Sequence, residues 1–475
     1  MRPETIVFAL AAAVLTAAIF FGGGAQRGLI SDAVPELLAL PLIFLCIGNG
    51  LCQLMQRPAL VVLLACILLT PLVQLVPLPA EFSLSLPGRE DVSLTLQQAG
   101  VELSWFPISL RPPETWRSFL SLLPATALCL AAASLDLKRR VWLIALVVAL
   151  VLANVVVGFI QIIGGPDSAF YLFTVTNSGS AVGFFANANH YTALLYATLP
   201  LAVALFAERF NLNLVPLTTA LVTTISSFLI GLAISGSRTA LILGSVGLVS
   251  SLLFVGREAI TSHLSRKKLA ALAAGVGFLL VPVLLGVGVL TIFRRFSEKT
   301  VIDDARWVIL QPVLDLMKLY APVGSGIGTF ERAYQTHETA SSLMVETVNH
   351  AHNDWLELAV EGGLPVMALL AVWLIWLALA SVTAIKQGFA IQARLEKAAF
   401  IALWLLTIHS LWDYPLRTIA VSSVFGLCIG ILVAPPRLNI ERSLDAFPAF
   451  LGENAPKKSR RHRRRQAIVS HDAGQ

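Results

Sequence analysis

The sequence has little charge. Asp, Glu, Lys and Arg together make up 13% of its 475 residues, against about 25% in soluble domains. An ordinary soluble domain needs a more highly charged surface than this composition can supply, so that class is excluded. Apolar residues instead account for 56% of the chain, and the mean hydropathy is +0.78. This composition is typical of an integral membrane protein.

Cysteine is scarce as well, with five residues in the chain. All of them fall inside apolar runs, and none are spaced as metal ligands usually are. The sequence therefore predicts neither a disulfide framework nor a cysteine-based metal site. It also lacks an internal repeat of fixed period, which excludes a solenoid or another repeat architecture.

Long apolar runs recur along the whole chain. Each is long enough to cross a hydrocarbon core of about 30 Å as a helix, and on this criterion we count about twelve. They cover residues 5–22, 33–54, 59–79, 115–135, 141–163, 190–208, 215–234, 237–256, 269–292, 355–385, 397–414 and 418–435. The sequence thus predicts an all-α polytopic membrane protein with about twelve transmembrane helices.

Basic residues indicate the orientation. With the N-terminus inside, the short loops around 138–140, 257–268 and 386–397 and the tail KKSRRHRRR are cytoplasmic, as the positive-inside rule requires. Cleavage of the first run as a signal peptide would leave the later spans unchanged. We expect a transmembrane domain over residues 1–435 and a disordered, basic cytoplasmic tail over 436–475. That tail is more typical of contact with anionic membrane lipid than with nucleic acid.

The largest outward loop covers residues 294–354, and it is too long for a simple connection. We expect it to be periplasmic and to carry amphipathic helices. One apolar face is predicted within DDARWVILQPVLDLMKLY, formed by Trp307, Leu310, Val313, Leu314 and Met317. This helix could lie along the membrane surface or cap the bundle. The following VGSGIGTF has no preceding strand and no GK[ST], which favours a structural turn over a phosphate-binding loop.

The stretch VNHAHNDWLELAVEGGLP places polar groups at the mouth of an apolar helix. If that helix begins near Asn353, its N-terminus creates a positive end at the outer face. The helix beginning at Arg238 has the same direction, and two such ends suit an anion such as phosphate. A polar stripe at helical spacing cannot face lipid. Its members are His350, Asp354, Glu357 and Glu361.

Five further side chains are candidates for chemistry or for its support. His352 can hold a neutral, proton-accepting form near neutral pH and is the candidate general base; His350 and His352 could instead only cap the helix. Arg238 and Arg306 could bind an anion, or could be a snorkelling residue and a surface charge. His409 and Asp413 stand four residues apart, and could form an ion pair or only make a helix end polar.

Together these motifs resemble the O-antigen ligase and O-antigen polymerase superfamily. They run from about residue 183 to 415 and read GFFANANHYTALL, SGSRTALIL, ARWVIL, VGSGIGTF, HAHNDWLELAVEGG and HSLWDYPL. The family's arginine motif is matched by Arg306 and Leu310, and its outer-face arginine by Arg238. Its histidine motif is matched by His352, Asn353 and Gly363. Val366 stands where this motif often has a second glycine, so the ligase branch is not singled out.

The resemblance implies a membrane glycosyltransferase at the periplasmic face of the bacterial inner membrane. The donor would be a polyprenyl-diphosphate-linked glycan, and the acceptor another glycan or lipid A-core. His352 would be the base, and Arg238 and Arg306 would bind the diphosphate. Asn353, His409 and Asp413 would support them, as would His350, in an orienting role with Asp354. Inversion at the anomeric carbon, with no metal and no cofactor, is implied too. A polymerase acting on the lipid carrier, or a transporter, are the alternatives.

Overall fold

The computed structural model describes residues 3–25, 30–207, 214–256, 305–338, 347–386 and 391–433. All of the described residues belong to one compact unit, Met1–Pro436, and the chain continues with a second unit, Arg437–Gln475. The second unit lies outside the described residues. The predicted span 269–292 and part of the predicted loop 294–354 also lie outside them, as does the predicted basic tail.

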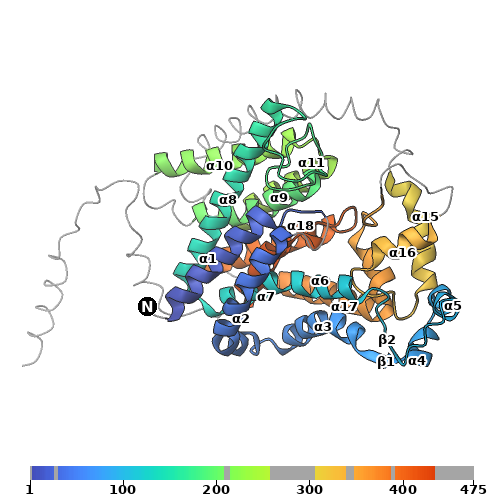
Figure 1. Ribbon diagram of the computed structural model, residues 1–475. Helices are drawn as coiled ribbons and strands as arrows, with labels where there is room; N and C mark the ends of the chain where they lie inside the picture. The colour runs from blue at the N-terminus through green and yellow to red at the C-terminus, as the bar shows by residue number, and fades with distance from the viewer. Residues whose placement is uncertain are drawn as a thin grey trace, which may run out of the picture. The chain divides into compact units, whose positions relative to one another are not determined.

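The first unit is built from helices, as the apolar runs predict (Figure 1). Up to the second polar region they are α1 (Pro3–Phe21), α2 (Ala33–Leu54), α3 (Pro58–Leu75), α4 (Ala80–Leu84), α5 (Glu90–Gln98), α6 (Pro112–Ser121), α7 (Leu123–Ser134) and α8 (Leu137–Gly164). The later ones are α9 (Ala188–Ala207), α10 (Leu214–Ile234), α11 (Arg238–Ser251), α15 (Ala305–Leu319), α16 (Phe330–His337), α17 (Asp354–Ile385), α18 (Ile391–His409) and α19 (Ile419–Val433). Shorter turns are Ile30–Asp32, the π-helical Leu252–Gly256 and Pro415–Arg417.

Eight of the described helical segments are long and apolar enough to cross a membrane. Ala220–Ile234 and Ile419–Val433 are shorter apolar helices. The protein is therefore a helical, polytopic integral membrane protein, whereas the number twelve remains a prediction. One small departure from helix is an antiparallel ribbon of β1 (Pro77–Pro79) and β2 (Trp105–Pro107). Its prolines are tolerated because both strands of a two-stranded ribbon are edges.

Helix α9 is the most buried of the long helices. It packs against α8, α10, α11 and α18, and side chains are buried along its length. Polar side chains accompany the apolar ones, among them His190, Thr192 and Thr198, which are fully buried. Since lipid does not satisfy such groups, their burial requires partners inside the protein. The start of α9 is one wall of the site described below.

Helix α17 is broken at Gly363, and the glycine-rich turn VGSGIGTF hydrogen-bonds to the backbone at this break. Gly363 has φ 58° and ψ −153°, which are non-helical values. The carbonyl of Val360 accepts from the Ser325 amide at 3.0 Å, and that of Glu361 accepts from the Gly326 amide at 2.9 Å. Gly324, Gly326 and Gly328 all have positive φ. The preference for a structural turn in VGSGIGTF is therefore confirmed.

Helices α15 and α16 lie beside α17, as Figure 1 shows. The buried face of α15 consists of Ile309, Val313 and Leu316, and Tyr320 directly after the helix extends it. Of the predicted apolar face, Val313 belongs to this buried set, while Trp307 is 59% exposed; that the predicted face lies along the membrane surface stays a prediction. The buried residues repeat every three to four positions, as those of the predicted face do. Packing against α17 and α16 determines which of the two sets is buried.

Candidate functional site

The start of α17 is fixed by Asn353. Its side-chain oxygen accepts from the amides of Trp355 and Leu356 at 3.0 and 3.1 Å, which is an ordinary N-cap. The preceding His352 has φ 49°, in the left-handed region that side chains other than glycine seldom adopt. Non-glycine residues whose backbone is kept in this left-handed region cluster at functional sites. The His352 side chain remains 29% exposed and reaches the turn after α18.

That turn supplies Asp413, a fully buried carboxylate at which several elements meet. Its Oδ1 lies 3.5 Å from Nδ1 of His352 and 3.8 Å from Nε2 of His190 on α9. Its Oδ2 lies 3.5 Å from Nη2 of Arg306 on α15 and accepts from the Asn189 amide group. Burial alone would raise the pKa of Asp413, but the neighbouring imidazoles of His190 and His352 hold it well below its usual range.

The start of α11 joins this carboxylate through two side chains. Ser237 caps the helix, because its hydroxyl accepts from the Ala240 amide at 3.2 Å. The same hydroxyl donates to the Asn189 side-chain oxygen at 2.7 Å, and Asn189 in turn donates to Asp413. Arg238, half-buried, is the first residue of α11. Its helix end therefore lies one residue from the chain of hydrogen bonds that leads to Asp413.

Tyr414 is the aromatic centre of the site. Its ring stacks on His350 with centroids 4.0 Å apart, and meets His190 and His352 edge-on at 4.6 and 5.3 Å. Three histidines that come from α9 and from the segment before α17 are thus held around one buried ring. Such packing restricts the imidazoles to a few orientations.

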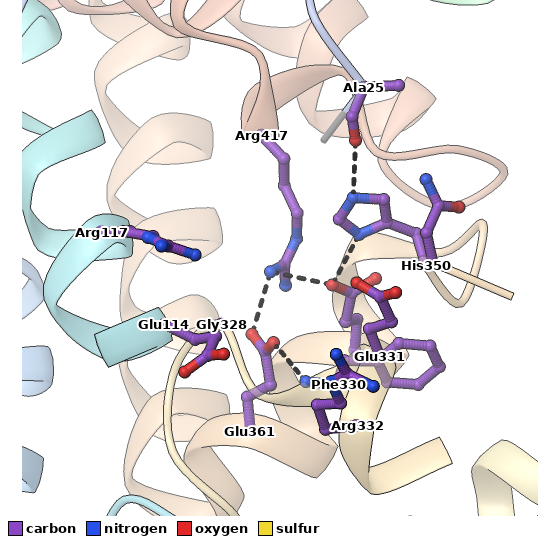
Figure 2. Close-up of a pocket in the computed structure, with 12 residues that line it drawn as sticks. Ala25, Glu114, Arg117, Gly328, Phe330, Glu331, Arg332, His350, Glu361 and Arg417 are labelled. Atoms are coloured by element: carbon purple, nitrogen blue, oxygen red, sulfur yellow. Dashed lines mark hydrogen bonds and ion pairs between the residues drawn. The ribbon is translucent and has the colours of Figure 1, made fainter. Parts of the chain in front are cut away.

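A second cluster of charges surrounds Arg417, as Figure 2 shows. The guanidinium contacts Asp354, Glu357 and Glu361, each at 2.9 Å. Burial would lower the pKa of Arg417, but these three carboxylates raise it above its usual range. The polar stripe predicted from the sequence is buried, with exposures of 0 to 7% for its four members. The prediction that it does not face lipid is confirmed.

Residues 220–371 match the family model described as O-antigen ligase. This segment of the chain is similar to the O-antigen ligase family. The match covers Arg238, Arg306 and the whole His352–Gly363 motif, so the superfamily resemblance is confirmed. A search of curated proteins finds no match to the chain.

Two partners predicted for site residues differ in the structure. His350 was expected to act with Asp354, but its Nδ1 lies 2.9 Å from Oε1 of Glu357. Asp354 instead meets Arg417 and accepts from the Ser410 hydroxyl at 2.9 Å. The reason is helical geometry: Glu357 lies one turn further on and its carboxylate folds back to the Ala351 amide, which brings it to His350.

Of the two interpretations of His409 and Asp413, an ion pair or a polar helix end, the described side chains do not form the ion pair. Nδ1 of His409 meets the Tyr196 hydroxyl on α9, inside the bundle. The Asp413 amide still donates to the His409 carbonyl at 3.1 Å, so the backbone keeps the i, i+4 relation and only the two side chains take different partners. Asp413 faces His352, His190 and Arg306 instead.

Four residues of the site were not singled out from the sequence: Asn189, His190, Tyr414 and Arg417. Asn189 and His190 stand in NANHYTALL at the start of α9, and Tyr414 and Arg417 stand in WDYPLR. Polar residues at the ends of apolar runs were the available signal. Asp413, Tyr414 and Arg417 lie beyond the matched O-antigen ligase domain. Within the described ranges, no three His, Cys, Asp or Glu side chains are grouped to hold a metal ion.

Proposed function

We propose that this protein is an O-antigen ligase-like glycosyltransferase. It would move a glycan from a polyprenyl-diphosphate carrier to an acceptor hydroxyl, in the biosynthesis of cell-surface polysaccharide. The observation that carries the proposal is the contact of His352 with the buried Asp413 carboxylate, whose other oxygen faces Arg306. A base, its orienting carboxylate and a cation for the leaving group are the parts that this transfer needs.

His352 would act as the general base. Asp413 faces Nδ1, and a carboxylate there favours the tautomer with its proton on Nδ1, leaving Nε2 to accept one. The acceptor oxygen attacks the anomeric carbon as its proton passes to Nε2. The bond from that carbon to the phosphate oxygen breaks, and the polyprenyl diphosphate leaves with the electron pair. Asp413 would stabilise the imidazolium that forms, as the carboxylate of a catalytic triad does.

Arg306 and Arg238 would bind the diphosphate. A diphosphate that carries negative charge through the reaction is stabilised by fixed guanidinium groups and by a helix N-terminus. The start of α11, at Arg238, offers both. Arg306 lies 35% exposed beside Asp413, close to His352. We further propose attack from the face opposite the leaving group, with inversion, and without a metal ion.

We place the reaction at the periplasmic face of the bacterial inner membrane, with both termini cytoplasmic. The O-antigen ligase match and the positive-inside pattern support this. A polymerase that extends O-antigen or exopolysaccharide on the lipid carrier would use the same chemistry with a different acceptor. A transporter should carry its polar groups near the membrane midplane; here they gather at the starts of α9, α11 and α17.

The proposal is tested with purified protein in nanodiscs and a polyprenyl-diphosphate-linked glycan as donor. We expect transfer to an acceptor glycan or lipid A-core, with release of polyprenyl diphosphate, at the same rate with and without EDTA. Absence of transfer to either acceptor would contradict the proposed function, and loss in EDTA alone would contradict metal independence. In a deletion strain, loss of lipid A-core attachment indicates a ligase, and shorter glycan chains indicate a polymerase.

A further inference from the structure

A cavity of about 250 Å³ lies beside the Arg417 cluster (Figure 2). This is roughly eight times the ~30 Å³ that one water molecule takes up in the liquid, so the cavity accommodates more than a single ion or water. Its walls include Arg117 from α6, Glu331 from α16 and Glu361 from α17. His350 and Asn349, just before His352 in the chain, line it too. The cavity therefore adjoins the proposed reaction centre.

The lining offers hydrogen-bond donors and acceptors in nearly equal number. Three arginines and four glutamates line the cavity: Arg117, Arg332, Arg417, Glu114, Glu331, Glu357 and Glu361. With charges so nearly balanced, the walls do not favour a phosphate, which would be repelled by the carboxylates. They suit a neutral, polyhydroxylated ligand, because each hydroxyl can donate to a carboxylate and accept from a guanidinium.

One buried donor points to a missing ligand group. Arg417 is only 7% exposed, and its Nε and Nη1 meet carboxylates. Its Nη2 is buried and has no hydrogen-bond partner within the part of the chain that the structure describes. A buried donor left unpaired costs about 1–3 kcal/mol, so a ligand hydroxyl in the cavity would stabilise it. Figure 2 shows Arg117 extending from α6 toward the same guanidinium.

We propose that this cavity binds one neutral sugar residue of the transferred or accepting glycan. The inference rests on the proposed function, since it names what the glycan contacts. Asn349 and His350 connect the cavity to His352, and Tyr414 stacks on His350 while its edge faces His352. Glu114, Arg117 and Arg417 lie outside the matched residues 220–371. Sugar discrimination would thus come in part from segments outside the O-antigen ligase domain.

The test uses full-length protein in nanodiscs and saturation-transfer NMR with free sugars. The probes are glucose, galactose, mannose and N-acetylglucosamine, with glucuronic acid and inorganic diphosphate as charged ligands. We expect at least one neutral sugar to bind, and Arg117→Gln and Glu331→Gln each to weaken it about tenfold. Lys318→Gln is the matched control, because Lys318 is an exposed cation on α15 outside the cavity; it should change binding less than twofold.

The same variants are then assayed for transfer. For Arg117→Gln we expect KM for the glycan substrate to rise about tenfold, with kcat within threefold of wild type. No binding of any neutral sugar, or loss of diphosphate binding alone in Arg117→Gln, would overturn the sugar site. So would an unchanged KM in an active enzyme, which leaves the proposed function intact. Sugar binding by a wild-type protein that transfers nothing would instead overturn the proposed function and leave the site standing.

Discussion

At the scale of single residues, Asp413 connects the parts of the site. It is fully buried and faces two histidines, one arginine and one asparagine. A buried carboxylate is costly unless it is paired, so these contacts explain how it can be there. The same contacts orient His352 and Arg306. Asp413 therefore links the stability of the site with its chemistry.

Asp413→Asn tests this link. The amide keeps the shape but loses the charge that stabilises a protonated His352, so transfer should fall about 10²–10⁴-fold, as in catalytic triads. The pKa of Asp413 is depressed in the folded protein, so its stabilising effect is present above its unfolded pKa and is lost only as pH falls through the lower, folded value. The variant should therefore melt below wild type throughout the range from pH 8 to 5. A difference that vanishes within that range would contradict the assignment.

Arg306 and Arg238 are tested by a series at each position. Alanine should lower transfer about 10²–10³-fold, the usual effect of removing one group that stabilises developing negative charge. Lysine should restore only part of the rate, because an ammonium does not reproduce the guanidinium fork. Arg57→Ala serves as control, since Arg57 is exposed at the start of α3 and distant in sequence from every site residue. Near-normal transfer by both alanine variants would show that the two arginines do not bind the diphosphate and are only surface charges.

At the scale of elements, the break in α17 shapes the site. Gly363 interrupts the helix, so the carbonyls of Val360 and Glu361 accept hydrogen bonds from amides of the turn between α15 and α16 instead of from their own helix. The Gln74 side chain of α3 also donates to the Glu361 carbonyl at 3.0 Å. The break thus joins the turn between α15 and α16 to the acidic stripe of α17 that pairs with Arg417.

Gly363→Ala should therefore destabilise the protein. A Cβ at this position would lie 2.1 Å from the Pro322 carbonyl oxygen, and φ is +58°. Strain of this kind costs more than about 1 kcal/mol, and overpacking adds about 1–3 kcal/mol. The matched control is Gly48→Ala in α2, where a Cβ meets nothing within 4 Å; it should stabilise the helix by up to about 1 kcal/mol. Equal melting temperatures of the two variants would show that the break is not constrained.

The elements also show what could be predicted from sequence. Helices cover eleven of the twelve predicted apolar ranges, because membrane-crossing length and hydrophobicity are local properties of the chain. The remaining range, 269–292, lies outside the described residues. The face of α15 that packs against α16 and α17 is a stripe beside the predicted one, with Val313 in common, because two stripes satisfy the same period and only the packing partner distinguishes them.

Pairings within the site depend on contacts between distant segments, so they could not be predicted in the same way. His352, Asn353 and Asp413 were identified as site residues by their types and by the family resemblance. That His352 meets Asp413, and that Arg417 gathers three acidic residues of α17, follows from how α9, α17 and the turn before α19 pack. No spacing along the chain encodes these contacts. His409 takes a distant partner, Tyr196 on α9, whereas His350 pairs with Glu357, one turn beyond the expected Asp354.

At the scale of the whole molecule, the proposed transfer reaction requires the site to face the periplasm. A single cysteine at Thr336, exposed on α16, should react with a membrane-impermeant maleimide in intact spheroplasts. A cysteine at Lys386, the exposed residue that follows α17, should react only after permeabilisation. The native cysteines, of which Cys52 is exposed, are first replaced. Labelling at position 386 in intact spheroplasts would invert the orientation and put the site in the cytoplasm.

The central claim is that His352 removes the proton from the acceptor hydroxyl. The decisive measurement is the transfer rate of His352→Ala in nanodiscs, from a purified polyprenyl-diphosphate-linked donor and normalised to folded protein. If His352 is the general base, the transfer rate should fall about 10²–10⁴-fold. Donor binding should be retained, because the arginines supply it. His337→Ala is the control, since His337 ends α16 and bonds to the Ala333 carbonyl away from Asp413; it should transfer normally. A fully active His352→Ala protein would contradict the account.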